Sequence, residues 1–414
     1  MKNINTNVLI IGGNSSQGIS IIRSMGALGF KLSVLSDKHL SPGFYSRYTY
    51  KKYYYDYRSK ILDDSDVFGL INNIIVNDRI DFVFTVEEKI IKILNDYKDK
   101  MYKNCIFLIP EQTLFNKVLR KEQTGKLFEE CGFKHPKTIA VNTRESMPSF
   151  CEMTFPVIVK QSFKSKIEYL NDSSRDSVVN RKPVLNVEDL QVILSNIIAE
   201  DQLIVQEYIS GDEGSIMFVA ENGCLRSAIQ SVYTAEILRG LSISRKSIAL
   251  DKELSAMLSI FCKNTNWVGV GGLDYIKAEN GYHILECNGR FTASTNLSLC
   301  LGIDLPCMHL EAFTHKGTYV CNNRTAEYDS ECHDATLSGL TWWLIYVILG
   351  KVKHCGGKLN ALLYYASFFI CNKRNFDMFL IKDPAPAFIE VLSMLSKPFT
   401  LLANKFYMKK RLYL

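Results

Sequence analysis

The sequence predicts an α/β protein that begins with a doubly wound parallel sheet and continues into an α+β block of antiparallel strands. Near the N-terminus, short apolar runs alternate with helical patterns, which is typical of a parallel sheet with helices on its faces. Beyond residue 202 strand patterns follow one another directly, as they do in antiparallel sheets. The composition, 47% hydrophobic and 22% charged residues, is that of a globular chain.

The first region is expected to be Rossmann-like. Its strands are short apolar runs, and its helices show a period of 3.6 residues. A glycine-rich turn, Gly12 to Gly18, joins the first strand to the first helix and is a place where a phosphate could bind. We expect strands at 8–11, 31–35, 81–85 and 105–109, and helices at 19–28, 66–76 and 87–98.

The middle region mixes helices with antiparallel strands. A polar stretch at 161–181 predicts a surface loop. We expect helices at 116–131, 187–198 and 254–265, strands at 155–160, 203–207 and within 215–249, and a hairpin at 272–288.

The C-terminal region contains two strongly apolar segments, 342–349 and 361–371. Each is shorter than the roughly 20 residues that a spanning helix needs. We therefore expect amphipathic helices packed on the core. The alternative is peripheral contact with the inner leaflet of the membrane, assisted by the basic residues 409–411.

Charge and cysteine spacing exclude several classes of protein. The formal net charge is +6, from 49 basic and 43 acidic residues, without the dense basic stripe that nucleic-acid binding requires. The 12 cysteines include no C-x-x-C pair, which argues against zinc ribbons and thioredoxin motifs. The N-terminus does not read as a secretory signal, so we expect a cytoplasmic protein with reduced thiols.

The most informative stretch is the hairpin that contains Asp274 and Glu286. A three-residue loop, Glu279 to Gly281, would pair residue 278 with 282 and so place Asp274 directly opposite Glu286. A two-residue loop would instead place Asp274 on the other face. Under the three-residue loop Asn288 shares the face of Glu286, and the three side chains form a site for a hard cation such as Mg²⁺.

Arg290 follows two residues after Asn288 and offers a planar donor for phosphate oxygens. The stretch LDYI followed by LECNGRF resembles the metal hairpin of the ATP-grasp superfamily. Cys287 and Gly289 depart from that pattern, but neither removes a ligand. The resemblance covers about residues 113–318 and implies three parts: a pre-ATP-grasp domain at 1–112, an ATP-grasp domain at 113–318 and a helical, apolar region at 319–414.

The resemblance also implies a nucleotide site for ATP. Lys117 is similar to the family's first nucleotide lysine, and Lys160, at the end of the strand FPVIVK, to the lysine that meets the phosphates. The segment LIVQEYISGDE is similar to the hinge that holds adenine and ribose. From it the implied nucleotide-binding residues are Gln206, Glu207, Ile209 and Glu213.

The implied activity is that of a carboxylate–amine ligase, of the D-aspartate ligase or carbamoyl-phosphate-synthetase-like type. Such an enzyme uses ATP and Mg²⁺, with Mn²⁺ as an alternative, on small-molecule carboxylate and amine substrates. Lys160 and Arg290 would act on the transferred phosphoryl group. A cell-envelope or polysaccharide precursor as acceptor, and a homodimer, are further expectations.

Two other classes stay open from the residues alone. The glycine-rich turn at 12–18, with Asp37 after the second strand, is compatible with a dinucleotide-dependent oxidoreductase. A catalytically silent nucleotide-binding protein is the other. Glu87 is a candidate for substrate contact, and Arg239 or Arg245 for contact with the acceptor's carboxylate or phosphate.

Overall fold

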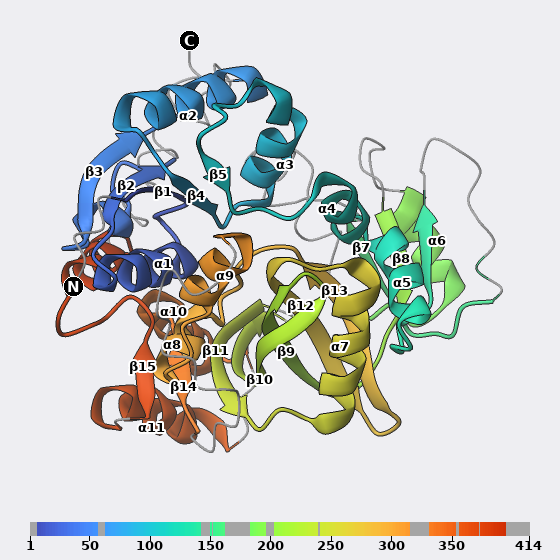
Figure 1. Ribbon diagram of the computed structural model, residues 1–414. Helices are drawn as coiled ribbons and strands as arrows, with labels where there is room; N and C mark the ends of the chain where they lie inside the picture. The colour runs from blue at the N-terminus through green and yellow to red at the C-terminus, as the bar shows by residue number, and fades with distance from the viewer. Residues whose placement is uncertain are drawn as a thin grey trace, which may run out of the picture.

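The computed structural model describes residues 6–56, 63–141, 150, 152–161, 183–195, 203–238, 241–314, 331–352, 356–371 and 373–394. Three sheets organise these residues, with five, three and seven strands. Figure 1 shows the five-stranded sheet at the N-terminal end of the molecule and the seven-stranded sheet below it. Most of the polar loop expected at 161–181 lies outside the described residues.

The five-stranded sheet is parallel, as predicted, with the order β3-β2-β1-β4-β5. Its central strands are apolar because both faces are covered by helices. The edge strand β3 was not predicted, because its residues TYKKYY are largely exposed and form no apolar run. The elements are β1 (Asn7–Ile11), α1 (Ser16–Ala27), β2 (Lys31–Ser36), η1 (Pro42–Tyr45), β3 (Thr49–Tyr54), α2 (Asp64–Asp78), β4 (Phe82–Thr85), α3 (Glu88–Asp96), η2 (Lys98–Lys100) and β5 (Ile106–Phe107).

The expected helix at 116–131 is divided in two by Arg120, whose backbone is extended (φ −99°, ψ 111°). The hydroxyl of Thr124 donates to the carbonyl of Arg120 at 2.8 Å and so stabilises the break. The two helices are α4 (Gln112–Leu119) and α5 (Lys121–Glu130). Sequence periodicity did not reveal the break, because both halves keep helical spacing.

A small antiparallel sheet, in the order β6-β8-β7, has a hydrophobic core of its own. It lies apart from the other two sheets and is joined to the seven-stranded sheet by the residues that follow β8 (Figure 1). Its elements are β6 (Thr138–Val141), β7 (Val157–Gln161), α6 (Val187–Ser195) and β8 (Leu203–Glu207).

The seven-stranded sheet has the order β13-β12-β9-β10-β11-β14-β15. One face packs on α7, and the other packs on α9. The elements are β9 (Asp212–Glu221), β10 (Cys224–Leu238), β11 (Leu241–Ile248), α7 (Lys252–Thr265), β12 (Gly269–Ala278), β13 (Gly281–Asn288), α8 (Thr295–Cys300), α9 (Leu305–Thr314), β14 (His333–Ala335) and β15 (Arg374–Phe376).

The C-terminal region contains the two expected helices, α10 (Leu337–Ile348) and α11 (Gly357–Ile370). It is not helical throughout, since β14 and β15 extend the seven-stranded sheet at one edge. Three-residue strands give no alternating pattern, so sequence reading missed them. Among the described residues no helix is long and apolar enough to cross a bilayer.

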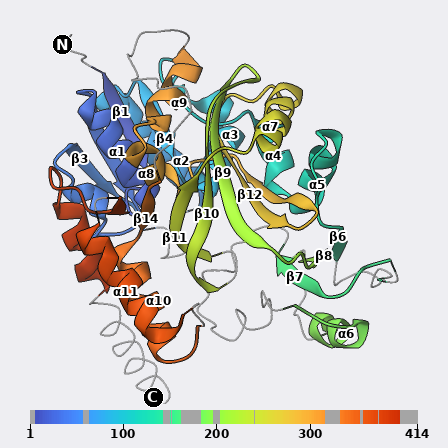
Figure 2. The same cartoon turned by 90° about the horizontal axis from the view of Figure 1, so that it is seen from below.

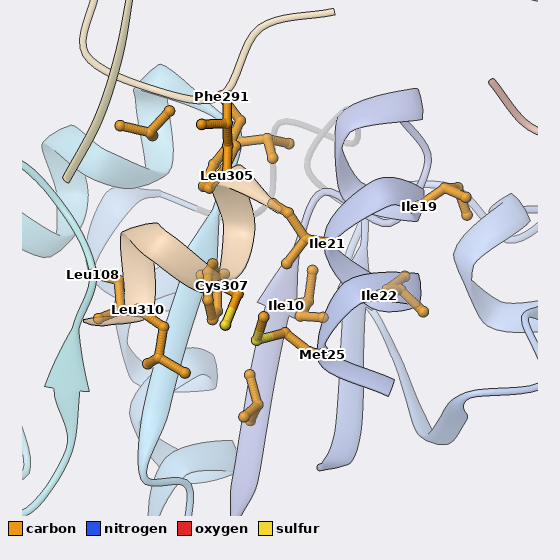
Figure 3. Close-up of a cluster of buried hydrophobic side chains, with 14 of the residues drawn as sticks. Ile10, Ile19, Ile21, Ile22, Met25, Leu108, Phe291, Leu305, Cys307 and Leu310 are labelled. Atoms are coloured by element: carbon orange, nitrogen blue, oxygen red, sulfur yellow. The ribbon is translucent and has the colours of Figure 1, made fainter. Parts of the chain in front are cut away.

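A shared hydrophobic core joins the N-terminal sheet to the seven-stranded sheet. Figure 3 shows Leu305 and Leu310 of α9 beside Ile10 of β1 and Met25 of α1, with Phe291 above them. Each of these side chains is at most 1% exposed. The loop after β13, which carries Arg290, is therefore held against the first region.

A buried ion pair joins the two ends of the described chain. Arg23 Nε lies 3.1 Å from Asp383 Oδ2, and both side chains are at most 7% exposed. Ser46 and the backbone N–H of Arg47 also donate to this carboxylate, at 2.9 and 2.8 Å. Asp383 thus fixes the segment after η1 as well as α1.

Candidate active site

The hairpin of β12 and β13 pairs Asp274 with Glu286, as predicted. The predicted three-residue loop is wrong, because Ala278 is opposite Gly281 and the loop contains only two residues. A bulge at Leu285, between the pairs Tyr275–Ile284 and Asp274–Glu286, shifts the register by one residue. The bulge therefore restores the pairing that the loop alone would have prevented.

The carboxyl groups of Asp274 and Glu286 lie on one face of the sheet and interact electrostatically. Burial, with the charge of Glu286 adding to it, raises the pKa of Asp274 to about 8. The pKa of Glu286 is lowered from its usual range, chiefly by the charge of Lys121. Asn288 donates from its amide to Asp274 Oδ2 at 3.3 Å. The three residues expected to hold a metal therefore lie together.

This set of donors fits Mg²⁺. Two carboxylates and an amide are hard oxygen donors, and Mg²⁺ in proteins is usually completed by water and substrate phosphates. Besides burial, the charge of Glu286 contributes to the raised pKa of Asp274, and a divalent cation bound between the two carboxylates would offset that repulsion. Within the described ranges no group of three His, Cys, Asp or Glu side chains is arranged for a metal.

Lys121, which the sequence analysis missed, is a basic residue at this pair. Its Nζ lies 3.2 Å from Glu286 Oε2, at the first residue of α5. Lys117, the lysine implied by the resemblance, is exposed on α4. The break at Arg120 places Lys121, and not Lys117, next to the carboxylates. The spacing of apolar residues does not show this break, so the sequence contained no signal for Lys121.

Lys160 of the small sheet acts on Glu286 through its charge. Its Nζ donates to Gln206 Oε1 at 2.9 Å, across the pairing of β7 with β8. The positive charge of Lys160 also contributes to the lowered pKa of Glu286. Gln206 is 2% exposed and donates in turn to Thr138 at 2.9 Å. The small sheet thus supplies a cation held by a buried amide.

The expected hinge residues connect the small sheet to the large one. Glu207 ends β8, and its Oε1 accepts from the N–H of Thr154 at 3.0 Å. Ile209 follows in the connection, and Glu213 lies near the start of β9, opposite Ile276. These residues lie along the segment that leads from β8 into β9, on the side of the site that carries Lys160.

Arg290 links the hairpin to the N-terminal region. Its Nε donates to Glu88 Oε1 at 2.8 Å, and both side chains are partly exposed. Its positive charge is near enough to Asp274 to counteract the rise in that group's pKa. Arg290 therefore borders the carboxylate pair while being oriented by the first residue of α3.

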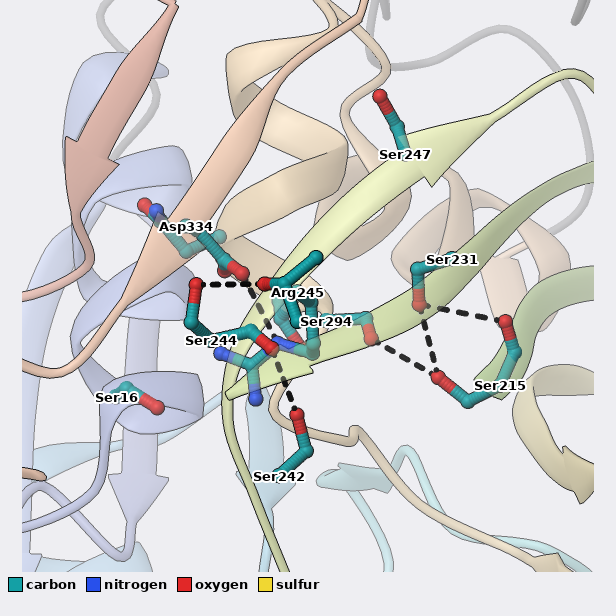
Figure 4. A network of polar contacts seen from close by, with 12 residues as sticks. Ser16, Ser215, Ser231, Ser242, Ser244, Arg245, Ser247, Ser294 and Asp334 are labelled. Atoms are coloured by element: carbon teal, nitrogen blue, oxygen red, sulfur yellow. Dashed lines mark hydrogen bonds and ion pairs between the residues drawn. The ribbon is translucent and has the colours of Figure 1, made fainter. Parts of the chain in front are cut away.

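A row of polar side chains continues across the sheet from the carboxylate pair. Tyr233 donates from its hydroxyl to Asp274 Oδ1 at 3.2 Å and lies opposite Arg245 in the next strand. Arg245 Nε lies 2.9 Å from Asp334 Oδ1, with side chains 3% and 0% exposed. Figure 4 shows this ion pair beside the hydrogen-bonded group Ser215, Ser231 and Ser294. Arg245 is therefore committed to a buried ion pair, and Arg239 lies outside the described residues.

The glycine-rich turn contacts a carboxylate. A Cβ placed on Gly12 would lie 3.1 Å from Glu87 Oε1, so Glu87 lies over the turn. Burial and the charge of Asp37 raise the pKa of Glu87 to about 7, while the hydroxyl of Tyr55 donates to it at 3.2 Å. An acidic side chain at this position is unfavourable for a bound pyrophosphate, which counts against the dinucleotide interpretation.

Comparison with known proteins agrees with this geometry. Residues 199–332 match a family model described as ATP-grasp in the biosynthetic pathway with Ter operon. No curated protein matches the chain.

Solved structures share the fold at low sequence identity. An L-amino acid ligase from Bacillus licheniformis has a TM-score of 0.57 at 14% identity, covering 75% of this chain and 74% of that chain. The Staphylococcus aureus N5-carboxyaminoimidazole synthetase with ADP has a TM-score of 0.60 at 14% identity, covering 82% and 86%. The Hydrogenobacter thermophilus 2-oxoglutarate carboxylase biotin carboxylase domain, with MgADP and bicarbonate, has a TM-score of 0.58 at 12% identity, covering 79% and 73%. The sheet topology and these structural likenesses show that the chain has the fold of these proteins, and residues 199–332 are similar to an ATP-grasp family.

Proposed function

We propose that the chain is an ATP-dependent carboxylate–amine ligase. The observation that carries this proposal is the pair Asp274 and Glu286, which lies among three cationic side chains from different parts of the fold. Lys121 of α5 and Lys160 of the small sheet both lower the pKa of Glu286, and Lys121 forms an ion pair with it. Arg290, in the loop after β13, lies near Asp274. Carboxylates surrounded by cations are suited to a metal–triphosphate complex, which carries both signs of charge.

In this proposal each residue has one role. Asp274, Glu286 and Asn288 hold Mg²⁺, or Mn²⁺ as the alternative, which neutralises phosphate charge when bound. Lys160 and Lys121 contact phosphate oxygens, and Arg290 stabilises the transferred group. The adenine and ribose are bound by the hinge; the proposed residues there are Gln206, Glu207, Ile209 and Glu213. Lys117, exposed on α4, has the weakest support.

The reaction proceeds in two balanced steps. A carboxylate oxygen of the first substrate bonds to the γ-phosphorus of ATP while the bond to the β–γ bridging oxygen breaks, giving ADP and an acyl phosphate. The amine nitrogen of the second substrate then bonds to the acyl carbon. Inorganic phosphate leaves with the electrons of the C–O bond, and the amine loses a proton to solvent.

The same proposal divides the chain into regions 1–112, 113–318 and 319–414. It also places the protein in the cytoplasm, in peripheral contact with the inner face of the membrane. The likeness to an L-amino acid ligase supports an amino acid as one substrate. We infer that the other is a small carboxylate or amine of a cell-envelope or polysaccharide precursor.

A substrate screen tests this function. Phosphate release is measured with MgATP and pairs drawn from amino acids, uronic acids and peptidoglycan precursors. We expect release that requires both an acid and an amine. The melting temperature should rise with MgATP and not with NAD, because only a ligand of the native state stabilises it. A rise with NAD alone, without one for MgATP, would overturn the ligase assignment.

A further inference from the structure

Helix α11 carries an apolar stripe on its solvent-exposed side. Leu359, Leu362, Leu363, Phe369 and Ile370 are exposed by 68, 49, 59, 60 and 81%. Their spacing, i, i+3, i+4, i+10 and i+11, places them on one face of the helix. A surface helix of a globular protein normally presents polar residues on that side.

The opposite side of α11 is fixed against the protein. Ala361 and Phe368 are 0% and 4% exposed, and the ring of Tyr364 lies 5.7 Å from that of Trp343 in α10. Because this inner face is packed, the helix cannot rotate to bury its outer stripe. The outer stripe is therefore a fixed feature of the surface.

The apolar surface continues beyond α11. Phe369 contacts Phe376 with ring centroids 5.1 Å apart, and the N–H of Phe379 donates to the carbonyl of Phe376. Figure 2 shows α10 and α11 side by side at one edge of the molecule. Further large apolar side chains at least 36% exposed in this region are Ile345, Ile348, Leu349, Phe379, Leu380, Ile381, Phe388 and Leu392.

On α10, α11 and the segment that follows them, the exposed charges have one sign. In the described residues between 337 and 394, the acidic side chains Asp377, Asp383 and Glu390 are at most 8% exposed. The charged side chains exposed there are Lys351, Lys358, Lys373 and Lys382. The sequence from 395 to 414 adds five basic residues and no acidic one. A basic border around an apolar face is complementary to an anionic, apolar partner.

We propose that the α11 surface, meaning the exposed apolar residues just named on α10, α11 and residues 379–392, binds the face of a bilayer that contains anionic phospholipids. The helix lies in the membrane plane with its apolar stripe toward the acyl chains and its lysines at the headgroups. With 14 residues, α11 is about 21 Å long, shorter than the roughly 30 Å of a hydrocarbon core, so it lies on the membrane and does not span it.

This inference rests only on the proposed membrane-side location and not on the ligase chemistry. Its site is remote from the carboxylate pair, since β14 and β15 form the sheet edge opposite β13. The two proposals can therefore be tested on one preparation and can fail separately.

Vesicle sedimentation of the full chain tests the proposal. We expect binding to vesicles of phosphatidylglycerol and phosphatidylcholine, at least tenfold weaker binding to phosphatidylcholine alone, and weakening by salt. The double change Leu359→Glu with Ile370→Glu should reduce partition at least tenfold. Ile260→Glu on α7, where Ile260 is 48% exposed, is the matched control and should partition like the parent. Melting temperature with and without MgATP reports folding and the nucleotide site independently.

Three results would overturn the inference. The first is equal partition of the double variant and the parent. The second is a dimer in light scattering without lipid that the double change dissociates, which would assign the surface to a second copy of the chain. The third concerns the fluorescence that a Leu363→Trp variant gains. If this fluorescence is shielded from iodide without vesicles and is not quenched by lipids brominated on their acyl chains, the surface would be assigned to residues 395–414.

Discussion

Lys121 and Glu286 form an ion pair, Nζ to Oε2 at 3.2 Å, between the first residue of α5 and the hairpin strand β13. The two residues are distant in sequence and meet because the chain breaks its helix at Arg120. The charge of Lys121 is the largest cause of the lowered pKa of Glu286, which keeps that carboxylate ionised. An ionised Glu286 is the form that binds a cation.

Replacing this lysine should reduce nucleotide use. We expect Lys121→Met to raise the KM for ATP and lower kcat/KM by about tenfold to a hundredfold, as the loss of a charge-assisted contact would. Lys117→Met, on the exposed side of α4, is the matched control and should remain near the parent. Steady-state ADP formation measures both. A larger loss for Lys117→Met than for Lys121→Met would favour the lysine that the resemblance implied.

The change Glu286→Gln keeps the shape of the side chain and removes its negative charge. The loss should fall on turnover more than on ATP affinity, because phosphoryl charge is redistributed in the transition state, and kcat should drop by roughly 10²–10³. ADP formation and melting temperature are measured on one preparation at saturating Mg²⁺. A lower melting temperature with normal turnover per folded molecule would show instead that Glu286 is a structural acid.

Glu87 should make stability depend on pH. Its pKa is raised from 4.5 to about 7, so between these values the native state keeps a proton that the unfolded chain has released. The free energy of unfolding therefore falls as pH rises through this window, and Glu87→Gln should remove that part of the fall. Melting temperatures between pH 4.5 and 8 check this. Glu152→Gln, at an 85% exposed side chain, should follow the parent; identical curves for all three proteins would refute it.

The pair Arg23 and Asp383 should contribute strongly to stability. Arg23→Met leaves a buried carboxylate without its main partner, which typically costs about 3–5 kcal/mol. Arg226→Met breaks an exposed pair with Glu221, where the expected cost is at most about 1 kcal/mol. Urea unfolding compares the two. Equal small losses would show that Asp383 is stabilised mainly by its bonds to Ser46 and Arg47.

The sequence alone determined the parallel N-terminal sheet and the opposed carboxylates. Strands buried on both faces must be apolar throughout, so runs such as VLII at residues 8–11 are visible without any knowledge of neighbours. Asp274 and Glu286 are on consecutive strands joined by a tight turn, and local spacing limits such pairs to two registers. The predicted three-residue loop was wrong, because the bulge at Leu285 produces this register with a two-residue loop.

Only the tertiary structure decided which distant residues complete the site and the fold. Lys121, Lys160 and Arg290 reach the carboxylates from three separate segments, and Arg245 is occupied by Asp334 of a strand too short to predict. The joining of Arg23 to Asp383 likewise connects the two ends of the described chain. Local patterns record periodicity and turn chemistry, whereas these pairs depend on how separate elements pack, and packing is set by the whole chain.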